Sequence, residues 1–370
     1  MKKIRVLVIE DSLTVRKHLV EALGAAPEFE VVGEAADGQR GIDLCLALRP
    51  DVVTLDMILP LLNGLQVTEH LMAYCPTPIL IVSSSTNRGE LFQTYQALAA
   101  GALDVLDKPR GDEPPGDWSE RLVSTLKVLA RIKVITHPRA RLVTRARAPG
   151  RPLLLSATRA AAAPRLVRQR PAVADGLRAV AIGVSTGGPA ALVALLQGLP
   201  EDFALPILLV IHLGPLFAPA FGEWLGEQSP LPVAYAQDGA ALPPHGEPQV
   251  LLAPPDRHLE LRAGRLLLTQ APAQHSCRPS VDVLFTSLAA ELGPRCAAGL
   301  LTGMGKDGAK GLLAIRRAGG RTVAQDEATS VVFGMPMEAI RLGAAEHVLP
   351  LGQIAPLLGA LARGDEGRHL

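Results

Sequence analysis

Aromatic side chains are scarce in this sequence of 370 residues, at 3% of the total, so its buried cores must be aliphatic. It also lacks any apolar run of the roughly 18–20 residues that a membrane-spanning helix needs, and we expect no membrane insertion. The short apolar run after Lys2 and Lys3 stops at Glu10, too soon for a secretion signal. We therefore expect a cytoplasmic protein.

Cysteine is rare, and its four copies form no CxxC pair and have no histidine at metal-ligand spacing. They are Cys45, Cys75, Cys277 and Cys296. This pattern is typical of buried or free thiols in a reducing compartment and does not indicate a disulfide framework.

Acidic residues are missing from Arg121 to Ala174, a stretch that holds 13 lysines and arginines and is rich in alanine and proline. With a net charge of +1 overall, the rest of the chain is mildly acidic. We interpret residues 126–175 as a basic linker between domains at 1–125 and 176–366. The alternative is an arm for nucleic acid or an acidic partner. The strip has no recognisable nucleic-acid-binding module and no interleaved aromatic residues, so we expect no nucleic-acid partner.

The first part alternates short β-branched runs with segments of helical apolar spacing. Strands are predicted at 4–10, 29–35, 51–57, 78–84 and 102–109, and helices at 13–23, 38–48, 65–73, 89–100 and from about Trp118. Such alternation predicts a doubly wound α/β domain, a parallel sheet with helices on both faces.

Polar residues gather at the carboxyl ends of these strands, where ligands bind in parallel sheets. They are Glu10, Asp11, Asp56, Ser83 and Lys108. Three carboxylates in one place repel each other and need a cation, and oxygen ligands suit Mg²⁺. The lysine and the hydroxyl beside them suit a phosphoryl group.

The motifs VIEDS, DVVTLDMILPLLNG, PILIVSSS and GALDVLDKP together resemble a two-component receiver domain. The resemblance implies that Asp56 accepts a phosphoryl group from a histidine kinase. It also implies Mg²⁺ ligands and phosphoryl contacts, namely Glu10, Asp11, Asp56 and the carbonyl of Ile58 for the metal, and Ser83 and Lys108 for the phosphoryl group. Receivers often carry an aromatic switch residue in the fifth strand, where this chain has Val105.

The second part repeats the α/β pattern on a larger scale. Strands are predicted at 177–185, 205–213, 231–237, 296–304 and 320–326, with three short strands in a hairpin region at 248–270. Helices are predicted at 189–197, 217–227, 281–292 and 308–318. A second α/β domain with a mostly parallel sheet follows.

Ser185 lies in the string GVSTGG, between an apolar strand and a helix. The G-x-S-x-G spacing is that of a nucleophile elbow. A glycine-rich turn before a helix can equally hold an anion, or be a plain turn. The string alone leaves these alternatives open.

A serine nucleophile needs a base and an acid that orients the base. His212 ends a strongly apolar strand, and its chief competitor is His258 in the hairpin region. Asp307 follows a strand and opens a helix, where an isolated acid would be favoured by the helix dipole alone. Three strand ends of one parallel sheet converge, so Ser185, His212 and Asp307 form a candidate triad.

Residues 176–366 resemble the catalytic domain of the chemotaxis protein-glutamate methylesterases, which also deamidate glutamine. The motifs are AIGVSTGGPAAL, VIHL, LAPPDRHLEL, RPSVDVLF, LTGMGKDGAKG and AQDEATSVVFGMPMEAI. The resemblance assigns Ser185 as nucleophile, His212 as base, Asp307 as orienting acid, and the backbone N–H groups near Thr186 and Met304 as oxyanion donors. Ile211, Leu213 and the stretch GPLFAPAF depart from the family pattern.

The resemblance implies an enzyme for chemosensory adaptation that removes methyl esters from methyl-accepting chemoreceptors and deamidates glutamines. The unphosphorylated receiver would cover the catalytic crevice. Mg²⁺ would serve the receiver, and no cofactor is expected for ester hydrolysis. Two alternatives are an adaptor that only binds and a DNA-binding regulator, which the intact triad and the missing helix-turn-helix pattern disfavour.

Overall fold

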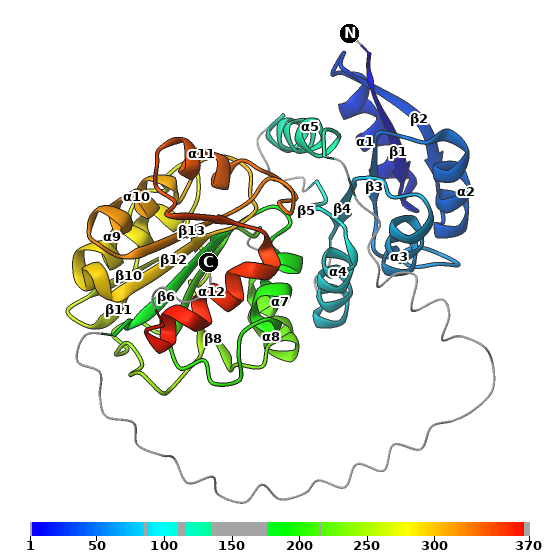
Figure 1. Ribbon diagram of the computed structural model, residues 1–370. Coiled ribbons are helices and arrows are strands. Elements are labelled where there is room, and N and C mark those ends of the chain that lie inside the picture. The colour runs from blue at the N-terminus through cyan, green and yellow to red at the C-terminus, as the bar shows by residue number, and fades with distance from the viewer. Residues whose placement is uncertain are drawn as a thin grey trace, which may run out of the picture.

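The computed structural model describes residues 2–84, 87–109, 116–132, 134, 176–214 and 216–365 (Figure 1). They form two α/β units, as the sequence predicts, and the first ends with helix α5 (Asp117–Leu129). This helix continues beyond the expected boundary at residue 125. Most of the expected linker, from 135 to 175, lies outside the described residues. No helix in the described ranges is both long and apolar enough to span a membrane.

The first unit is a parallel sheet with strand order β2-β1-β3-β4-β5. Its strands are β1 (Ile4–Ile9), β2 (Phe29–Ala35), β3 (Val52–Leu55), β4 (Ile79–Ser83) and β5 (Asp104–Asp107). Its other helices are α1 (Leu13–Gly24), α2 (Gly38–Leu48), α3 (Gly64–Tyr74) and α4 (Arg88–Ala100). Buried residues of α1 and α5 pack on one face, and those of α2, α3 and α4 on the other. The predicted doubly wound sheet is confirmed.

The second unit is a larger sheet with strand order β14-β13-β12-β6-β7-β9-β8, in which every pair is parallel. Its strands are β6 (Ala179–Val184), β7 (Ile207–Ile211), β8 (Val233–Tyr235), β9 (Val250–Leu252), β12 (Cys296–Leu300), β13 (Arg321–Gln325) and β14 (His347–Leu349). The predicted hairpin is a separate antiparallel pair, β10 (His258–Arg262) and β11 (Arg265–Thr269).

Helices cover both faces of this second sheet (Figure 1). The helices are α7 (Gly188–Gln197), α8 (Ala218–Gln228), α9 (Val281–Leu292), η1 (Gly293–Arg295), α10 (Ala309–Arg317), α11 (Met335–Arg341) and α12 (Leu351–Arg363). Buried residues of α7, α8 and α12 share one apolar cluster, and those of α9, α10 and α11 share another. Because β12, β6 and β7 are parallel neighbours in the sheet, their carboxyl ends lie side by side at one edge.

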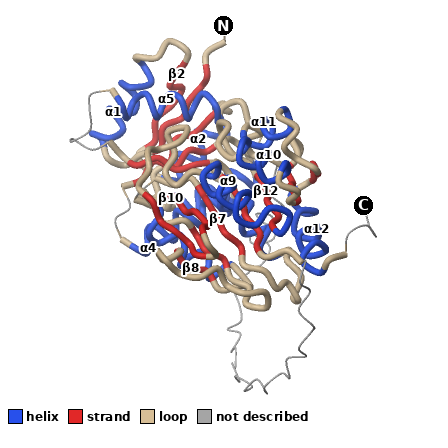
Figure 2. The backbone as a smooth tube through the Cα atoms, turned by 90° about the vertical axis from the view of Figure 1, so that its left-hand side faces the viewer, coloured by secondary structure: helices blue, strands red, loops and turns tan. Residues whose placement is uncertain are grey.

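The two units dock through α4, which packs against α7 and α8; both views place α4 against the second unit (Figures 1 and 2). Tyr95 on α4 is fully buried, and its ring contacts those of Phe221 and Trp224. Its hydroxyl donates to the carbonyl of Phe217. We call Tyr95, Phe217, Phe221 and Trp224 the docking face. Because one apolar cluster runs through both units, separating them exposes apolar surface to water.

Candidate active site

Ser185 stands at the turn between the buried strand β6 and helix α7. A side chain at Gly183 would place its Cβ 2.3 Å from Val281 Cγ1, so the strand can approach α9 only with glycine there. Gly187 has a φ of 77°, a left-handed conformation that glycine adopts without strain, and it precedes the first residue of α7. The two glycines of the motif thus build the sharp turn that presents the serine.

His212 follows the last residue of β7, the strand beside β6. Its backbone N–H donates to the carbonyl of Val184 at 3.1 Å, which continues the β6–β7 pairing by one residue. The residue after Val184 is Ser185, so the serine and the histidine occupy adjoining strand ends. The His212 side chain is 15% exposed.

Asp307 lies after β12, and its carboxylate caps the N-terminus of α9. Oδ1 accepts from Ser280 Oγ at 2.7 Å and from the Asp282 N–H at 3.0 Å. Oδ2 accepts from the Val281 N–H at 2.7 Å. The positive end of the helix dipole adds to these bonds and favours the ionised form.

The imidazole and the carboxylate are in contact, with His212 Nε2 2.9 Å from Asp307 Oδ2. Burial alone would raise the pKa of Asp307, but its bonds with His212, Ser280 and the backbone outweigh burial and lower it. Burial likewise favours neutral His212, yet its bonds and charge interactions with Asp307 and Cys277 raise its pKa to about 9. These contacts therefore favour the protonated ring in this conformation.

The other ring nitrogen, His212 Nδ1, lies 3.8 Å from the sulfur of Cys277. Among the described residues, the Ser185 hydroxyl makes no recorded hydrogen bond, so the serine–imidazole contact is not formed here. Cys277 is half-buried. The sequence predicted only a buried or free thiol at this position and gave no sign that it would meet the candidate base.

The first unit touches the turn that carries the serine. The Thr186 hydroxyl donates to Asp104 Oδ2 at 2.8 Å, and the Gly187 N–H donates to the carbonyl of Leu103 at 3.0 Å. Met304, the other expected oxyanion position, has a 42% exposed side chain. The first residue of β5 and the residue before it therefore contact the residues directly after Ser185.

His258, the competing base, is fully buried in β10 and has a different role. Its Nδ1 accepts the Ser280 N–H at 3.1 Å, and its Nε2 donates to the carbonyl of Pro272 at 3.2 Å. It thereby holds Ser280, which in turn holds Asp307. No role was predicted for Ser280, although a serine directly before an apolar helical run is a typical N-cap.

The acidic residues expected at the strand ends of the first unit lie close together. Carboxylate oxygens of Glu10, Asp11 and Asp56 lie within 4.8 Å of one another. Lys108 Nζ is 2.9 Å from Glu10 Oε1 and 2.9 Å from Asp56 Oδ2. The Lys108 N–H also donates to the carbonyl of Ser83, so the strand ends of β4 and β5 meet here.

These residues fit a hard divalent cation. Glu10 Oε2 is buried and has no hydrogen-bond partner among the described residues. Burial and the charge of Asp56 raise the pKa of Glu10 to about 7, and a further cation here would favour its ionised form. Ile58, the expected carbonyl ligand, is half exposed just after Asp56. The oxygen set suits Mg²⁺.

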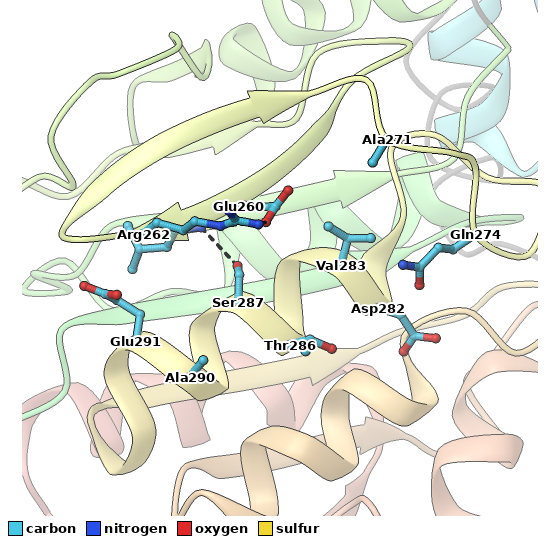
Figure 3. Close-up of a pocket in the computed structure, with 11 residues that line it drawn as sticks. Glu260, Arg262, Ala271, Gln274, Asp282, Val283, Thr286, Ser287, Ala290 and Glu291 are labelled. Atoms are coloured by element: carbon cyan, nitrogen blue, oxygen red, sulfur yellow. Dashed lines mark hydrogen bonds and ion pairs between the residues drawn. The ribbon is translucent and has the colours of Figure 1, made fainter.

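A cavity of about 540 Å³ opens between β10 and α9 (Figure 3). Several of its polar side chains are paired locally: Glu260 bonds with Arg262 and Thr269, and Ser287 accepts the Leu261 N–H. None of the candidate triad residues lines it. We therefore place the active site at the strand ends.

The two folds and their strand-end sites define a class of protein, a response-regulator receiver joined to an α/β esterase domain. The family model of the CheB methylesterases matches residues 180–358, and that of the response regulator receiver domain matches residues 6–114. The chain belongs to the family of receiver-linked CheB methylesterases.

Curated relatives match over nearly their whole length. Protein-glutamate methylesterase/protein-glutamine glutaminase 2 of Anaeromyxobacter dehalogenans is 42% identical over 98% of both chains. The protein of that name from Nitrosospira multiformis is also 42% identical, again over 98% of both. The crystal structure of the Thermotoga maritima CheB methylesterase catalytic domain is 37% identical, with a TM-score of 0.47, and covers 50% of this chain and 99% of its own.

Proposed function

We propose that this chain is a phosphorylation-activated hydrolase that removes methyl esters from glutamate side chains of chemoreceptors and deamidates selected glutamines. Residues 1–125 act as the regulatory receiver and residues 176–366 as the hydrolase, in the cytoplasm. The observation that carries the proposal is the convergence of Ser185, His212 and Asp307 at adjoining strand ends, under contacts from the receiver.

In this proposal the Ser185 hydroxyl attacks the γ-carbonyl of a methylated glutamate while neutral His212 accepts its proton at Nδ1. Asp307 holds Nε2 and stabilises the imidazolium that forms. The backbone N–H groups near Thr186 and Met304 bind the oxyanion, each worth about 10²–10³ in rate. The imidazolium then protonates the leaving methoxide, and methanol departs.

A water molecule next attacks the acyl-serine. His212 takes a proton from this water, the serine leaves with that proton, and the product carboxylate is released. With a glutamine side chain the leaving group is ammonia. His212 must be neutral at the start of each half-reaction, whereas its contacts here favour the protonated ring. In this proposal the docked arrangement is the resting state, because the receiver contacts Thr186 and Gly187, directly after the serine.

The receiver supplies the control. Asp56 accepts the phosphoryl group from a chemotaxis histidine kinase, with Lys108 pairing the added charge and Ser83 contacting its oxygens. Mg²⁺ held by Glu10, Asp11, Asp56 and the Ile58 carbonyl would neutralise charge during this transfer. Phosphorylation acts at the carboxyl ends of β4 and β5. Asp104, the first residue of β5, and Leu103 before it touch the serine turn, so β5 joins the two places.

Methanol release from methylated receptor, with and without a small-molecule phosphodonor, tests the proposal. We expect the phosphodonor to raise the rate, Ser185→Ala to abolish it in a folded protein, and Asp56→Asn to leave a low rate that the phosphodonor cannot raise. Methanol release by Ser185→Ala would refute the nucleophile, and a normal response by Asp56→Asn would refute the control.

A further inference from the structure

A second set of ligand atoms meets at the candidate base. One nitrogen of His212, the sulfur of Cys277 and an oxygen of Asp307 lie within 4.8 Å of one another. The proposed hydrolysis uses the histidine and the aspartate and gives the thiol nothing to do. Cys277 nevertheless lies close to the nitrogen that must accept the serine proton.

The backbone fixes the thiol in this place. Gln274 and Cys277 exchange two backbone hydrogen bonds, of 3.1 Å and 2.8 Å, which close a tight turn. Within the turn, His275 and Ser276 have φ values of 51° and 62°, a left-handed conformation uncommon for such residues. The thiol is therefore held at the imidazole by a closed turn.

We propose that His212 Nδ1 and Cys277 Sγ form a binding site for a Zn²⁺ ion, and that occupancy of this site reversibly inhibits the enzyme. The inhibition rests on the proposed function, whereas the binding of the metal does not. Histidine nitrogen and cysteine sulfur are preferred zinc ligands, while the hard cations Mg²⁺ and Ca²⁺ select oxygen.

The geometry is close to what zinc requires. Bonds of about 2.0 Å to nitrogen and about 2.3 Å to sulfur at a tetrahedral angle separate the two ligand atoms by roughly 3.5 Å. The observed separation of His212 Nδ1 and Cys277 Sγ is 3.8 Å, so a shift of a few tenths of an ångström suffices. Both side chains retain some exposure, which leaves a route for the ion and room for water ligands.

Asp307 supports the metal site from behind the ring. It binds His212 Nε2 at 2.9 Å, so Nδ1, once it loses its proton, is the nitrogen that can take a metal. A carboxylate on the far nitrogen of a metal-bound histidine fixes the ring and raises its basicity. The oxygens of Asp307 already accept four hydrogen bonds, so we assign it this supporting role and leave the remaining zinc positions to water.

Inhibition follows from the electron pair that the metal occupies. A zinc ion on His212 Nδ1 takes the lone pair that the Ser185 proton needs, so the hydrolase stops without unfolding. Zinc would also require the thiolate of Cys277 and an unprotonated Nδ1, so binding would release the thiol proton and the Nδ1 proton of the protonated ring. Mg²⁺ in large excess fills the oxygen-rich receiver site, so that site does not compete with His212 and Cys277 for zinc.

A neighbouring cluster of side chains is the alternative site at which a metal ion could bind. His275 Nε2 lies 3.2 Å from Asp282 Oδ2, and these two groups and Asp307 also lie within 4.8 Å of one another. That cluster contains no sulfur. A metal bound there would respond to substitution of His275 and not of Cys277.

Cobalt and zinc together test the proposal on the full-length chain. Co²⁺ added in excess Mg²⁺ should produce thiolate-to-cobalt charge-transfer absorbance in the wild type. The band should persist in Cys296→Ala and His275→Gln and vanish in both Cys277→Ser and Cys277→Ala. Absence of the band from the folded wild type, or its persistence in the folded Cys277 variants, would overturn the site.

Zinc inhibition of methanol release is then compared with each variant's own metal-free rate. We expect a zinc-selective chelator to restore the wild-type rate, and the inhibition constant to rise about tenfold or more in Cys277→Ser. An unchanged inhibition constant in that variant would refute the inhibitory role. If no methanol is released at all, the proposed function fails, while the cobalt band still decides the metal site.

Discussion

Replacing Tyr95 by phenylalanine tests how the receiver holds the hydrolase in its resting state. Tyr95 is fully buried at the docking face, and its hydroxyl donates to the carbonyl of Phe217 in the other unit. Phenylalanine keeps the ring contacts with Phe221 and Trp224 and removes only this bond. The substitution therefore isolates one polar contact between the two units.

The expected effect is a rise in the unphosphorylated rate. A buried neutral hydrogen bond contributes about 1 kcal/mol net. Since about 1.4 kcal/mol changes an equilibrium tenfold, the population of the undocked form should increase about fivefold. When the docked form predominates, methanol release without phosphodonor rises by the same factor. The fully phosphorylated rate should stay near that of the wild type, because the bond is absent from the undocked form.

Arg88→Gln provides the matched control. Arg88 and Glu223 form an ion pair across the same interface, but their side chains are 66% and 49% exposed. Exposed ion pairs are worth about 0.2–1 kcal/mol, so the rise should be smaller, about twofold. A Tyr95→Phe rate equal to or below the wild type, or a larger effect from Arg88→Gln, would refute the reasoning.

Three further substitutions test the serine turn, the triad and the receiver site. Asp104 accepts the Thr186 hydroxyl from the other unit, so Asp104→Ala should raise the unphosphorylated methanol-release rate, and an unchanged rate would contradict the role of this contact in docking. Ser280→Ala removes a bond to Asp307 worth about 1.5–3 kcal/mol, so kcat/KM should fall about ten- to hundredfold across its pH profile, with Ser280→Thr restoring most of it. A Ser280→Ala profile that matches the wild type would contradict this positioning role. Lys108→Met removes the cation shared by Glu10 and Asp56, and a phosphodonor should then no longer raise methanol release; a preserved response would contradict the assignment.

Much of the fold was predictable because both sheets are parallel and buried. Strands such as 4–10 and 205–213 are short apolar runs, and glycine or polar residues end the helices that follow. The same logic placed Ser185 and His212 on adjoining strand ends and Asp307 beside the histidine, since the ends of parallel strands share one edge. The local sequence pattern was therefore enough to predict those candidate site residues that lie at strand ends.

The missed features depend on long-range packing or have weak patterns. Helix α12 was not predicted, because Pro356 and two glycines interrupt its helical spacing. The partnership of Cys277 with His212 is set by a turn with unusual backbone angles, and the role of Ser280 by where α9 meets β12. The docking face could not be predicted either, because its rings come from α4 and α8 and meet only when the two units dock.

The docking face concentrates a residue type in which the chain is poor. Of the two tryptophans in the sequence, Trp224 lies in the docking face and Trp118 lies on α5, bonded to the carbonyl of Asp107. Separation of the units would take the Tyr95 ring away from the Trp224 indole, which would keep its contact with Phe221, and would leave Trp118 in its place. The intrinsic fluorescence of the unlabelled chain would then report in real time whether the receiver has released its hydrolase.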